Sequence, residues 1–265
     1  MKHPGVDKIA FTGEYKTAQV IMADAAPTLK RLTFELGGKS PNIVFSDADL
    51  DAAVAGAHAA LYFNHGQCCC AGSRLFVEDR VYDRVIEGMA ERNRSYHVGD
   101  PFDPQTEQGP LVDRAQFDKT MYYIGQGKSQ GARCVTGGER HGGRGYFVEP
   151  TLFADVSDTM KIAREEILGP VLSVLRFSDL DEVAQRANAT FYGLAAGIWT
   201  RDVKKAHYLA SKIRAGTIWV NCYNVLDAGT PFGGFKMSGM GRELGQQGIE
   251  TYTELKTVTM GLDQM

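Results

Sequence analysis

The sequence has no apolar run approaching the about 20 residues that a membrane-spanning helix needs. It also lacks a run of basic residues, and its formal net charge is -3, so nucleic acid is not an expected partner. Its first residues, MKHPGVD, contain no apolar core like that of a secretory signal. These absences lead us to expect a cytoplasmic protein that binds neither membranes nor nucleic acids.

Cysteines are few and do not form a disulfide framework. Of the 5 cysteines, Cys68, Cys69 and Cys70 are consecutive, and a disulfide between neighbours is strained. Cys134 and Cys222 are isolated in the chain. There is no CxxC pair and no second cluster with zinc spacing, so we expect no metal site. The pattern is typical of a reducing compartment, which agrees with the cytoplasm.

Short apolar runs alternate with segments of helical periodicity. We expect strands at residues 8–12, 31–36, 42–45, 172–177, 194–200 and 217–220. Helices are expected around residues 20–21 and at 50–61, 81–89, 117–124, 180–189 and 202–213. This alternation favours an α/β fold with a largely parallel sheet. The chain opens almost directly on a strand-turn-helix unit that cannot bury a sheet alone, so we expect an upstream segment to be missing.

The cysteine triplet is the first candidate for chemistry, in the segment FNHGQCCCAGSR at residues 63–74. A thiolate surrounded by small residues and amides can attack a carbonyl while nearby N–H groups hold the oxyanion. The commoner alternative is that these thiols are small buried hydrophobic groups. His65 is either a base for a thiol or a structural residue.

A second candidate is Glu35, which ends an apolar strand in the segment LTFELGGKSPN at residues 32–42. Burial of a carboxyl group raises its pKa toward neutrality, which suits a general base. The alternative is an ion pair with Lys39 or Arg31.

Two adjacent acids, Glu165 and Glu166, precede the turn Gly169-Pro170 and form the third candidate. Their carboxylates could be catalytic, cap a helix, bind a ribose, or lie on a solvated face.

The fourth segment, PFGGFKMSGMGRE at residues 231–243, is dense in glycine. This density predicts a sharply folded loop in which backbone approaches backbone. Its aromatic residues either wall a substrate channel or belong to the core.

Together and in this order, the segments FELGGKSPN, FNHGQCCCAGSR, EEILGPV and PFGGFKMSGMGRE resemble the aldehyde dehydrogenase superfamily. The resemblance covers essentially the whole chain but only the second part of a family member, which is about twice as long. It implies a three-layer α/β catalytic domain at residues 37–237 and a remnant of the Rossmann-like cofactor domain at 1–36. Residues 238–265 would return to the cofactor domain and end in an oligomerisation strand.

The resemblance implies an oxidoreductase that converts an aldehyde to a carboxylic acid with NAD or NADP. Cys69 would be the nucleophile that forms a thiohemiacetal and then a thioester, and its backbone N–H would be half of the oxyanion hole. Glu35 would be the general base that activates water. Phe63 and Phe232 would line the substrate channel.

The family pattern also implies a set of cofactor contacts, with Glu166 holding the nicotinamide ribose. The residues that match such contacts are Gly13, Leu36, Gly37, Gln116, Lys119, Glu166 and Leu168. We further expect a homo-oligomer, because Tyr252 to Leu262 resembles the subunit-bridging strand of the family.

Two departures from the family pattern concern the cofactor. Glu14 stands where the family has a small hydroxyl residue, and Ala18 or Gln19 replaces a later glycine, while Lys16 can compensate for the added charge. The upstream part, absent here, supplies the family's second oxyanion donor and its contacts to the adenosine ribose. Two other functions therefore stay open: a cofactor-independent, esterase-like remnant, or a non-catalytic oligomerisation partner.

Overall fold

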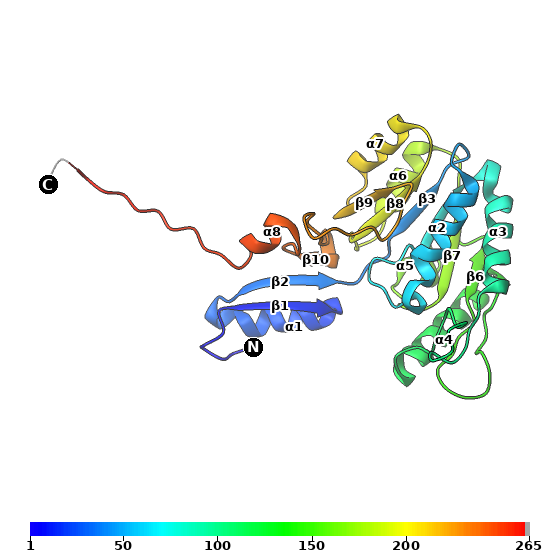
Figure 1. Cartoon of the computed structure of the whole chain (residues 1–265), viewed down its shortest axis with the longest axis horizontal. Helices are drawn as coiled ribbons and strands as arrows, with labels where there is room; N and C mark the ends of the chain where they lie inside the picture. The colour runs from blue at the N-terminus through cyan, green and yellow to red at the C-terminus, as the bar shows by residue number, and fades with distance from the viewer. Residues whose placement is uncertain (263–265) are drawn as a thin grey trace.

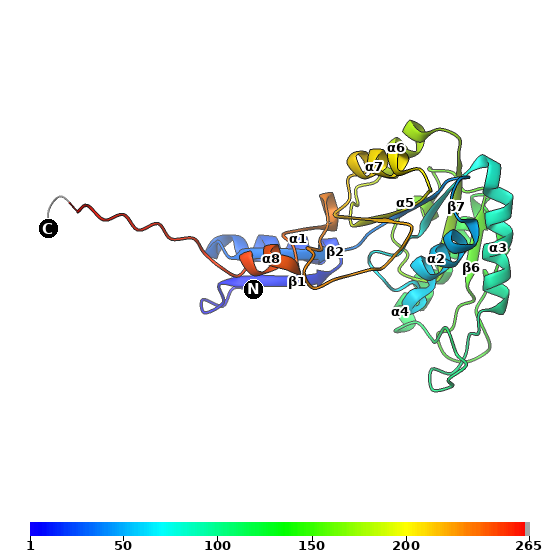
Figure 2. The same cartoon turned by 45° about the horizontal axis from the view of Figure 1, so that its top comes forward.

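A computed structural model describes residues 1–262 and contains two separate sheets. The smaller sheet has the strand order β1-β2-β10, with β1 (Lys8–Gly13), β2 (Arg31–Leu36) and β10 (Gly239–Met240). Strands β1 and β2 are parallel and are connected through helix α1 (Tyr15–Ala25), whereas β10 returns antiparallel to β2. Figures 1 and 2 show this unit beside the main body of the chain, with α8 (Gly245–Glu250) close to it.

The larger sheet has seven strands in the order β5-β6-β7-β4-β3-β8-β9. Its strands are β3 (Pro41–Val44), β4 (Arg74–Glu78), β5 (Arg133–Thr136), β6 (Thr151–Ala154), β7 (Val171–Phe177), β8 (Ala195–Trp199) and β9 (Thr217–Val220). Only the β5–β6 pair among these neighbours is antiparallel. The expected α/β fold with a largely parallel sheet is confirmed.

Helices cover both faces of the larger sheet, which gives three layers (Figure 1). One face packs against α2 (Leu50–Tyr62) and α3 (Tyr82–Ser95), and the other against α4 (Arg114–Ser129), α5 (Lys161–Arg164), α6 (Leu180–Asn188) and α7 (Val203–Lys212). Successive residues of a strand point to opposite faces of the sheet. Ile43 therefore packs on the side of α4 to α7, and Val44 packs on the side of α2 and α3. Burial on both faces explains why apolar residues predominate in these strands.

Aspartates begin four of the helices on the large sheet. The side chain of Asp49 accepts a hydrogen bond from the Ala52 N–H, and Asp113, Asp179 and Asp202 cap α4, α6 and α7 in the same way. Each cap satisfies N–H groups that have no partner within the helix. Short 3-10 turns occur at η1 (Ala26–Thr28), η2 (Phe63–Gly66), η3 (Asp79–Val81) and η4 (Lys236–Ser238).

The C-terminal segment leaves the body as an extended arm (Figures 1 and 2). Residues 253–262 pair with no strand of the described chain, and Leu255, Val258 and Met260 are exposed. The oligomerisation strand expected within 238–265 therefore has no partner inside one chain, and residues 263–265 lie outside the described part. Its pairing with a second copy stays a prediction.

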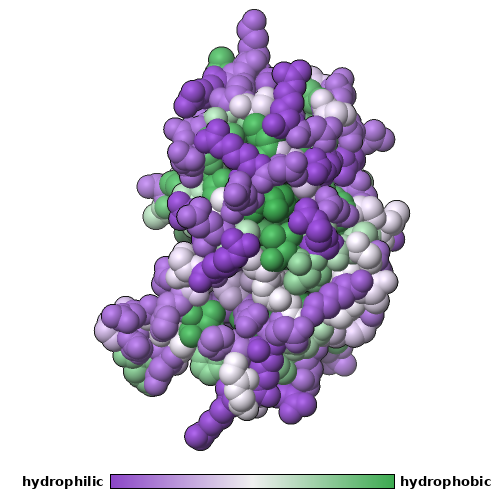
Figure 3. All heavy atoms as spheres, turned by 90° about the vertical axis from the view of Figure 1, so that its right-hand side faces the viewer, coloured by the Kyte–Doolittle hydropathy of each residue, from purple (hydrophilic) through white to green (hydrophobic). Residues whose placement is uncertain are grey.

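The surface seen in Figure 3, on the side of α3 and α4, is mostly hydrophilic with a small hydrophobic area near its centre. Across residues 1–262, no helix combines the length and the apolar character needed to cross a membrane.

Candidate active site

The cysteine triplet lies in a loop between η2 and β4 whose backbone is held by hydrogen bonds. The Ala71 N–H donates to the Cys68 carbonyl at 3.1 Å, and the Gly72 N–H donates to the Ala60 carbonyl at the end of α2, also at 3.1 Å. Cys70 is buried in a small apolar cluster with Trp219, and Cys69 packs at the edge of this cluster. The loop therefore presents Cys69 at the margin of the core rather than within it.

The three thiols interact with one another, and all five cysteines are free. Cys68 Sγ and Cys70 Sγ are 3.5 Å apart. Hydrogen bonding with Cys69 and Cys70 lowers the pKa of Cys68. Hydrogen bonding with Cys68, together with burial, raises the pKa of Cys69 and of Cys70. The pKa values of the three thiols therefore depend on one another, and they belong to the group rather than to any one sulfur.

The dipeptide Gly37-Gly38, which follows β2, separates Cys69 from Glu166. A Cβ on Gly38 would lie 2.4 Å from the Cys69 carbonyl oxygen, and one on Gly37 would lie 2.2 Å from Glu166 Oε2. The Gly38 N–H also donates to Glu166 Oε1 at 3.1 Å. Only residues without a side chain leave room for this approach. Three of the four segments singled out in the sequence therefore meet at this point.

Substitution Gly38→Ala is expected to disturb the cysteine loop, because the added Cβ meets backbone rather than a flexible side chain. We expect the free energy of unfolding to fall by about 1–3 kcal/mol, the usual effect of overpacking. A displacement of about 1 Å at the nucleophile should also lower the turnover of an activated ester about 100-fold. Urea unfolding and ester hydrolysis measure the two effects.

A matched control is Gly125→Ala on the exposed side of α4, where nothing lies within 4 Å of the added Cβ. This change should raise stability by about 0.5–1 kcal/mol and leave turnover unaltered. Equal effects of the two substitutions would show that Gly38 does not control the position of Cys69.

The carboxyl group of Glu35 is buried at the end of β2, next to the glycine-rich fourth segment. Gly239 of β10 is its partner across the sheet, and a Cβ on Gly233 would lie 2.8 Å from Glu35 Oε1. Burial, together with the charge of Glu243, raises the pKa of Glu35 to about 8, although the charge of Arg242 opposes the rise. Within residues 1–262, Glu35 Oε2 has no hydrogen-bond partner. A carboxyl group that titrates near neutral pH has the property that a general base needs.

The alternative ion pairs of Glu35 are not formed within the described residues. Lys39 Nζ has no hydrogen-bond partner, and Arg31 lies 3.7 Å from Glu254. Lys39 is completely enclosed, and burial, together with the charge of Arg74, lowers its pKa to about 7 although Glu166 opposes this. Sequence reasoning considered Lys39 only as a partner of Glu35 and missed this buried amine.

The two adjacent acids separate into different environments. Glu165 accepts a hydrogen bond from the Tyr123 hydroxyl of α4 at 2.7 Å, whereas Glu166 faces Gly37 and Gly38. Burial raises the pKa of Glu166, while the Gly38 N–H and the charges of Lys119 and Lys39 lower it. Glu166 is thus a partly buried hydrogen-bond acceptor beside the thiol loop, and a solvated face is excluded for it.

Gln116 donates hydrogen bonds from its side-chain amide to the turn that follows Glu166. Its Nε2 donates to the carbonyls of Ile167 and Leu168 at 2.9 and 2.8 Å. These bonds hold the turn after Glu166, in which Leu168 has a φ of 60°. The structure therefore brings Gln116 to the turn, where its amide orients the backbone next to Glu166, while Lys119 stays exposed on α4.

The remaining predicted residues lie at the edges of this region. Phe232 packs in the same apolar cluster as Cys69, whereas the Phe63 side chain is 60% exposed. Gly13 ends β1 opposite Leu36, whose side chain is buried against α1. Only the backbone of Leu36 can therefore contact a ligand.

His65, which the sequence left open as a base or a structural residue, packs beside Gly109. A Cβ on Gly109 would meet the His65 ring at 3.6 Å, so the ring lies beside that backbone, and burial lowers its pKa. Within residues 1–262 no group of three or more His, Cys, Asp or Glu side chains is arranged to hold a metal ion.

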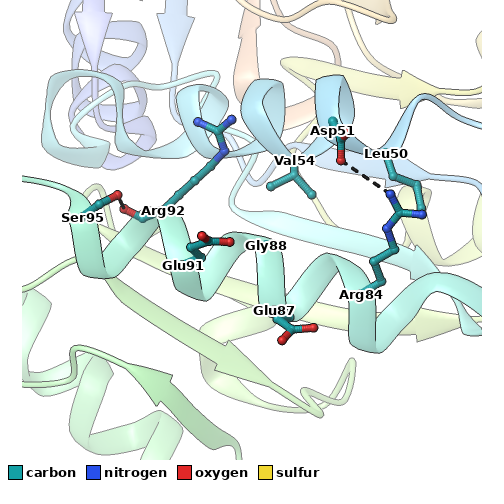
Figure 4. A pocket seen from close by; sticks show the side chains of 9 residues that line it. All are labelled: Leu50, Asp51, Val54, Arg84, Glu87, Gly88, Glu91, Arg92 and Ser95. Atoms are coloured by element: carbon teal, nitrogen blue, oxygen red, sulfur yellow. Dashed lines mark hydrogen bonds and ion pairs between the residues drawn. The ribbon is translucent and has the colours of Figure 1, made fainter.

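A surface groove between α2 and α3 has a volume of about 510 Å³ (Figure 4). Its lining carries charges of both signs, and Arg84 lies 3.6 Å from Asp51 across it. It contains no cysteine, and its lining includes none of the residues described above, so we assign the chemistry to the region around Cys69.

Sequence reasoning missed Arg242, Glu243 and Tyr223 as members of the site. The first two lie in the quoted fourth segment, but their effect on Glu35 depends on how that loop folds back on β2. Tyr223 follows β9, and its hydroxyl donates to the Cys70 carbonyl at 2.7 Å. No local pattern signals that contact, because it joins residues 153 positions apart.

Comparison with known proteins supports one family throughout. The sequence profile described as the aldehyde dehydrogenase family matches residues 1–258. The chain is 55% identical over 263 residues to the human protein named aldehyde dehydrogenase, mitochondrial, covering 99% of this chain and 51% of that protein. It is 52% identical to mouse retinal dehydrogenase 2, with 99% and 51% covered.

Solved structures give the same result. An NAD+ complex of aldehyde dehydrogenase from Bacillus cereus superposes with a TM-score of 0.97 and 47% identity, covering 99% of this chain and 53% of that one. The NAD-dependent aldehyde dehydrogenase from Sinorhizobium meliloti has a TM-score of 0.97 and 43% identity, with 99% and 52% covered. The chain thus spans about half the length of the curated relatives it matches.

Proposed function

The chain belongs to the aldehyde dehydrogenase family, and from this premise we propose that it oxidises an aldehyde to a carboxylic acid through Cys69. The observation that carries the proposal is the meeting of Cys69 and Glu166 across Gly37-Gly38, at the end of the strand that holds Glu35. The proposed nucleophile Cys69 and the partly buried acceptor Glu166 contact the two glycines, and Glu35, whose pKa is raised, lies two residues before Gly37 on β2.

In the proposed reaction, the Cys69 thiol first gives its proton to water, and the thiolate then attacks the aldehyde carbon. The Cys69 N–H donates to no acceptor within residues 1–262 and is free to receive the oxyanion of the thiohemiacetal. NAD or NADP, when bound, supplies the hydride acceptor. The oxidised adduct on Cys69 is a thioester. Glu35 removes a proton from water, the water oxygen attacks the thioester carbon, and the C–S bond breaks, which frees the Cys69 thiolate and releases the carboxylic acid. The covalent adduct divides one difficult step into two easier ones.

The residues present fit the nicotinamide-ribose end of such a cofactor. The Glu166 carboxylate is a buried acceptor suited to a ribose hydroxyl, and Leu36 and Gly37 offer backbone close to it. Gln116 holds the turn that contains Leu168. Lys119 adds positive charge nearby.

The residues at the start of α1, which would face the pyrophosphate of the cofactor, fit less well. Glu14 follows Gly13 and precedes α1, and it forms no side-chain cap there. The Lys16 ammonium lies 3.7 Å from the Glu14 carboxylate and reduces its charge. A helix N-terminus normally favours the negative pyrophosphate, so Glu14 should weaken dinucleotide binding.

The wider organisation is proposed on the same basis. The two separate sheets support a cofactor-domain portion at 1–36, a catalytic domain at 37–237 and a return at 238–265. The exposed apolar residues of the C-terminal arm support a homo-oligomer. The cytoplasmic location predicted from the free cysteines gains no support from relatives that are named mitochondrial.

A second candidate function is the hydrolysis of activated esters without a cofactor. It is favoured by Glu14 at the start of α1, because a weakened dinucleotide site leaves Cys69 and Glu35 unaffected. The acyl-enzyme route needs no hydride acceptor.

The deciding experiment follows NADH formation from a small apolar aldehyde, with calorimetric titration of NAD and NADP on the same protein. Hydride transfer, with heat of binding, is the expected result. Ester turnover without dinucleotide binding would select the hydrolase. An inert thiol together with a stable oligomer would contradict both and leave a non-catalytic oligomerisation partner.

A further inference from the structure

Tyr223 connects a distant part of the chain to the cysteine loop. It lies just beyond β9, and its hydroxyl donates to the Cys70 carbonyl at 2.7 Å. Its ring packs on Trp219 with centroids 4.6 Å apart, and a Cβ on Gly197 would lie 2.8 Å from ring carbons. Burial raises the pKa of Tyr223, so the hydroxyl keeps its proton and remains a donor. A rigid, closely packed ring thus holds this hydrogen bond in place.

The Cys70 carbonyl is one end of a short series of peptide units. The peptide that contains this carbonyl also contains the Ala71 N–H, which donates to the Cys68 carbonyl at 3.1 Å. The peptide of the Cys68 carbonyl in turn contains the Cys69 N–H. Because each peptide unit is planar, fixing a carbonyl also fixes the direction of the N–H in the same unit. The series therefore runs from the Tyr223 hydroxyl to the Cys69 N–H.

Hydrogen bonds arranged in series also strengthen one another. A peptide whose carbonyl accepts a hydrogen bond becomes a better donor at its own N–H, by about 10–30% per bond. Two such bonds precede the Cys69 N–H, the first from Tyr223 and the second from Ala71. The N–H at the end of the series is the one without an acceptor in the described chain.

Asn224, the residue after Tyr223, forms a hydrogen bond with the side chain of Cys70. Cys70 Sγ donates to Asn224 Oδ1 at 3.5 Å, and Asn224 itself has a φ of 56°. Cys70 is thus held by its carbonyl and its thiol, and it cannot turn into the position of Cys69.

We propose that the Tyr223 hydroxyl orients and polarises the backbone N–H of Cys69 through the two peptide units between them, so that this N–H receives the oxyanion. Tyr223 is thereby a positioning residue and does not touch the substrate. This inference rests on the proposed acyl-transfer role of Cys69.

The test is Tyr223→Phe, which removes the hydroxyl and keeps the ring. Complete loss of an oxyanion donor lowers rates about 10²–10³-fold. Because this variant only weakens and misaligns the donor, we expect about a 10-fold fall in kcat for p-nitrophenyl acetate, with KM changed less than about 2-fold. Alkylation of Cys69 by iodoacetamide forms no oxyanion and should keep its rate. Amide hydrogen exchange at Ala71 should become faster, because the peptide is released.

The control is Tyr208→Phe on α7, whose hydroxyl bonds to Asp181 on the surface. It should leave all three measurements unchanged. Equal losses in esterolysis and alkylation by Tyr223→Phe would overturn the proposal, since they would mean that the hydroxyl only places the sulfur. Unchanged esterolysis would overturn it too.

The failure of the proposed function gives a different result. If Cys69 of the unsubstituted protein reacts with iodoacetamide but never with the ester, acyl transfer is refuted. The oxyanion role of Tyr223 is then refuted with it. In that case, amide hydrogen exchange at Ala71, compared between the unsubstituted protein and Tyr223→Phe, still shows whether the Tyr223 hydroxyl anchors the cysteine loop.

Discussion

Replacement of Cys69 by alanine is expected to lower acyl transfer from an activated ester by at least about 10³-fold. Removal of the nucleophile of a covalent mechanism eliminates the intermediate, and only catalysis by binding and oxyanion contacts is left. The fold should persist, because Cys69 lies at the margin of its apolar cluster and the small alanine side chain leaves little space. Release of p-nitrophenol from p-nitrophenyl acetate measures the loss, and mass spectrometry of the quenched protein shows whether an acyl group is attached.

Two other cysteines make this experiment selective. Cys68→Ala removes a neighbour of the nucleophile but not the nucleophile, so we expect a loss of only about 10-fold or less, the effect of one lost hydrogen bond. Cys134→Ala, in β5 on the outer edge of the large sheet, should have no effect on turnover. If Cys68→Ala were inactive and Cys69→Ala active, the nucleophile would be Cys68.

Glu35→Gln is expected to slow deacylation by about 10²–10⁴-fold, the usual contribution of a general base. The amide is nearly isosteric but cannot accept a proton from water. Since burial raises the pKa of Glu35 to about 8, the carboxyl group is mostly protonated below that pH and becomes a base above it. Deacylation of the unchanged chain should therefore rise as pH increases through about 8, and the Glu35→Gln variant should lose this rise.

Glu243→Gln is the matched variant, because the charge of Glu243 contributes to the raised pKa of Glu35. Without this charge, the midpoint of the pH–rate profile should move to lower pH while the plateau rate stays within a small factor. Stopped-flow measurement of the acyl-enzyme between about pH 6 and pH 10 yields both profiles. A midpoint that does not respond to Glu243→Gln, or a profile that survives Glu35→Gln, would assign the ionisation to another group.

Periodicity predicted the strands at 31–36 and 217–220 with the bounds that the structure has, while β7 begins one residue earlier than expected, at Val171. Apolar and β-branched residues predominate in these strands. Periodicity missed β4 (Arg74–Glu78), at the centre of the sheet, and β5 and β6 (Thr151–Ala154) at one edge. Runs of four or five residues are short enough for strand and helix patterns to be confused.

Local sequence also left the chemistry of the cysteine triplet open, because three thiols in a row are compatible with a buried apolar cluster. In the structure, Cys70 is buried beside Trp219, and Cys69 is partly buried at the margin of the same cluster. The order of the four motifs settled the family, which the comparisons confirm. The roles of individual residues stay predictions until the substitutions are made.

By itself, the sequence determined the α/β class, the family, and the residue types available for catalysis, because these follow from periodicity and from motifs that are contiguous in the chain. Only the tertiary structure decided how those residues act. The raised pKa of Glu35, the passage of Gly37-Gly38 between Cys69 and Glu166, and the bond from Tyr223 to Cys70 each join segments far apart in sequence. Burial, electrostatic fields and close backbone approach depend on the packing of the whole chain, and no local pattern encodes them.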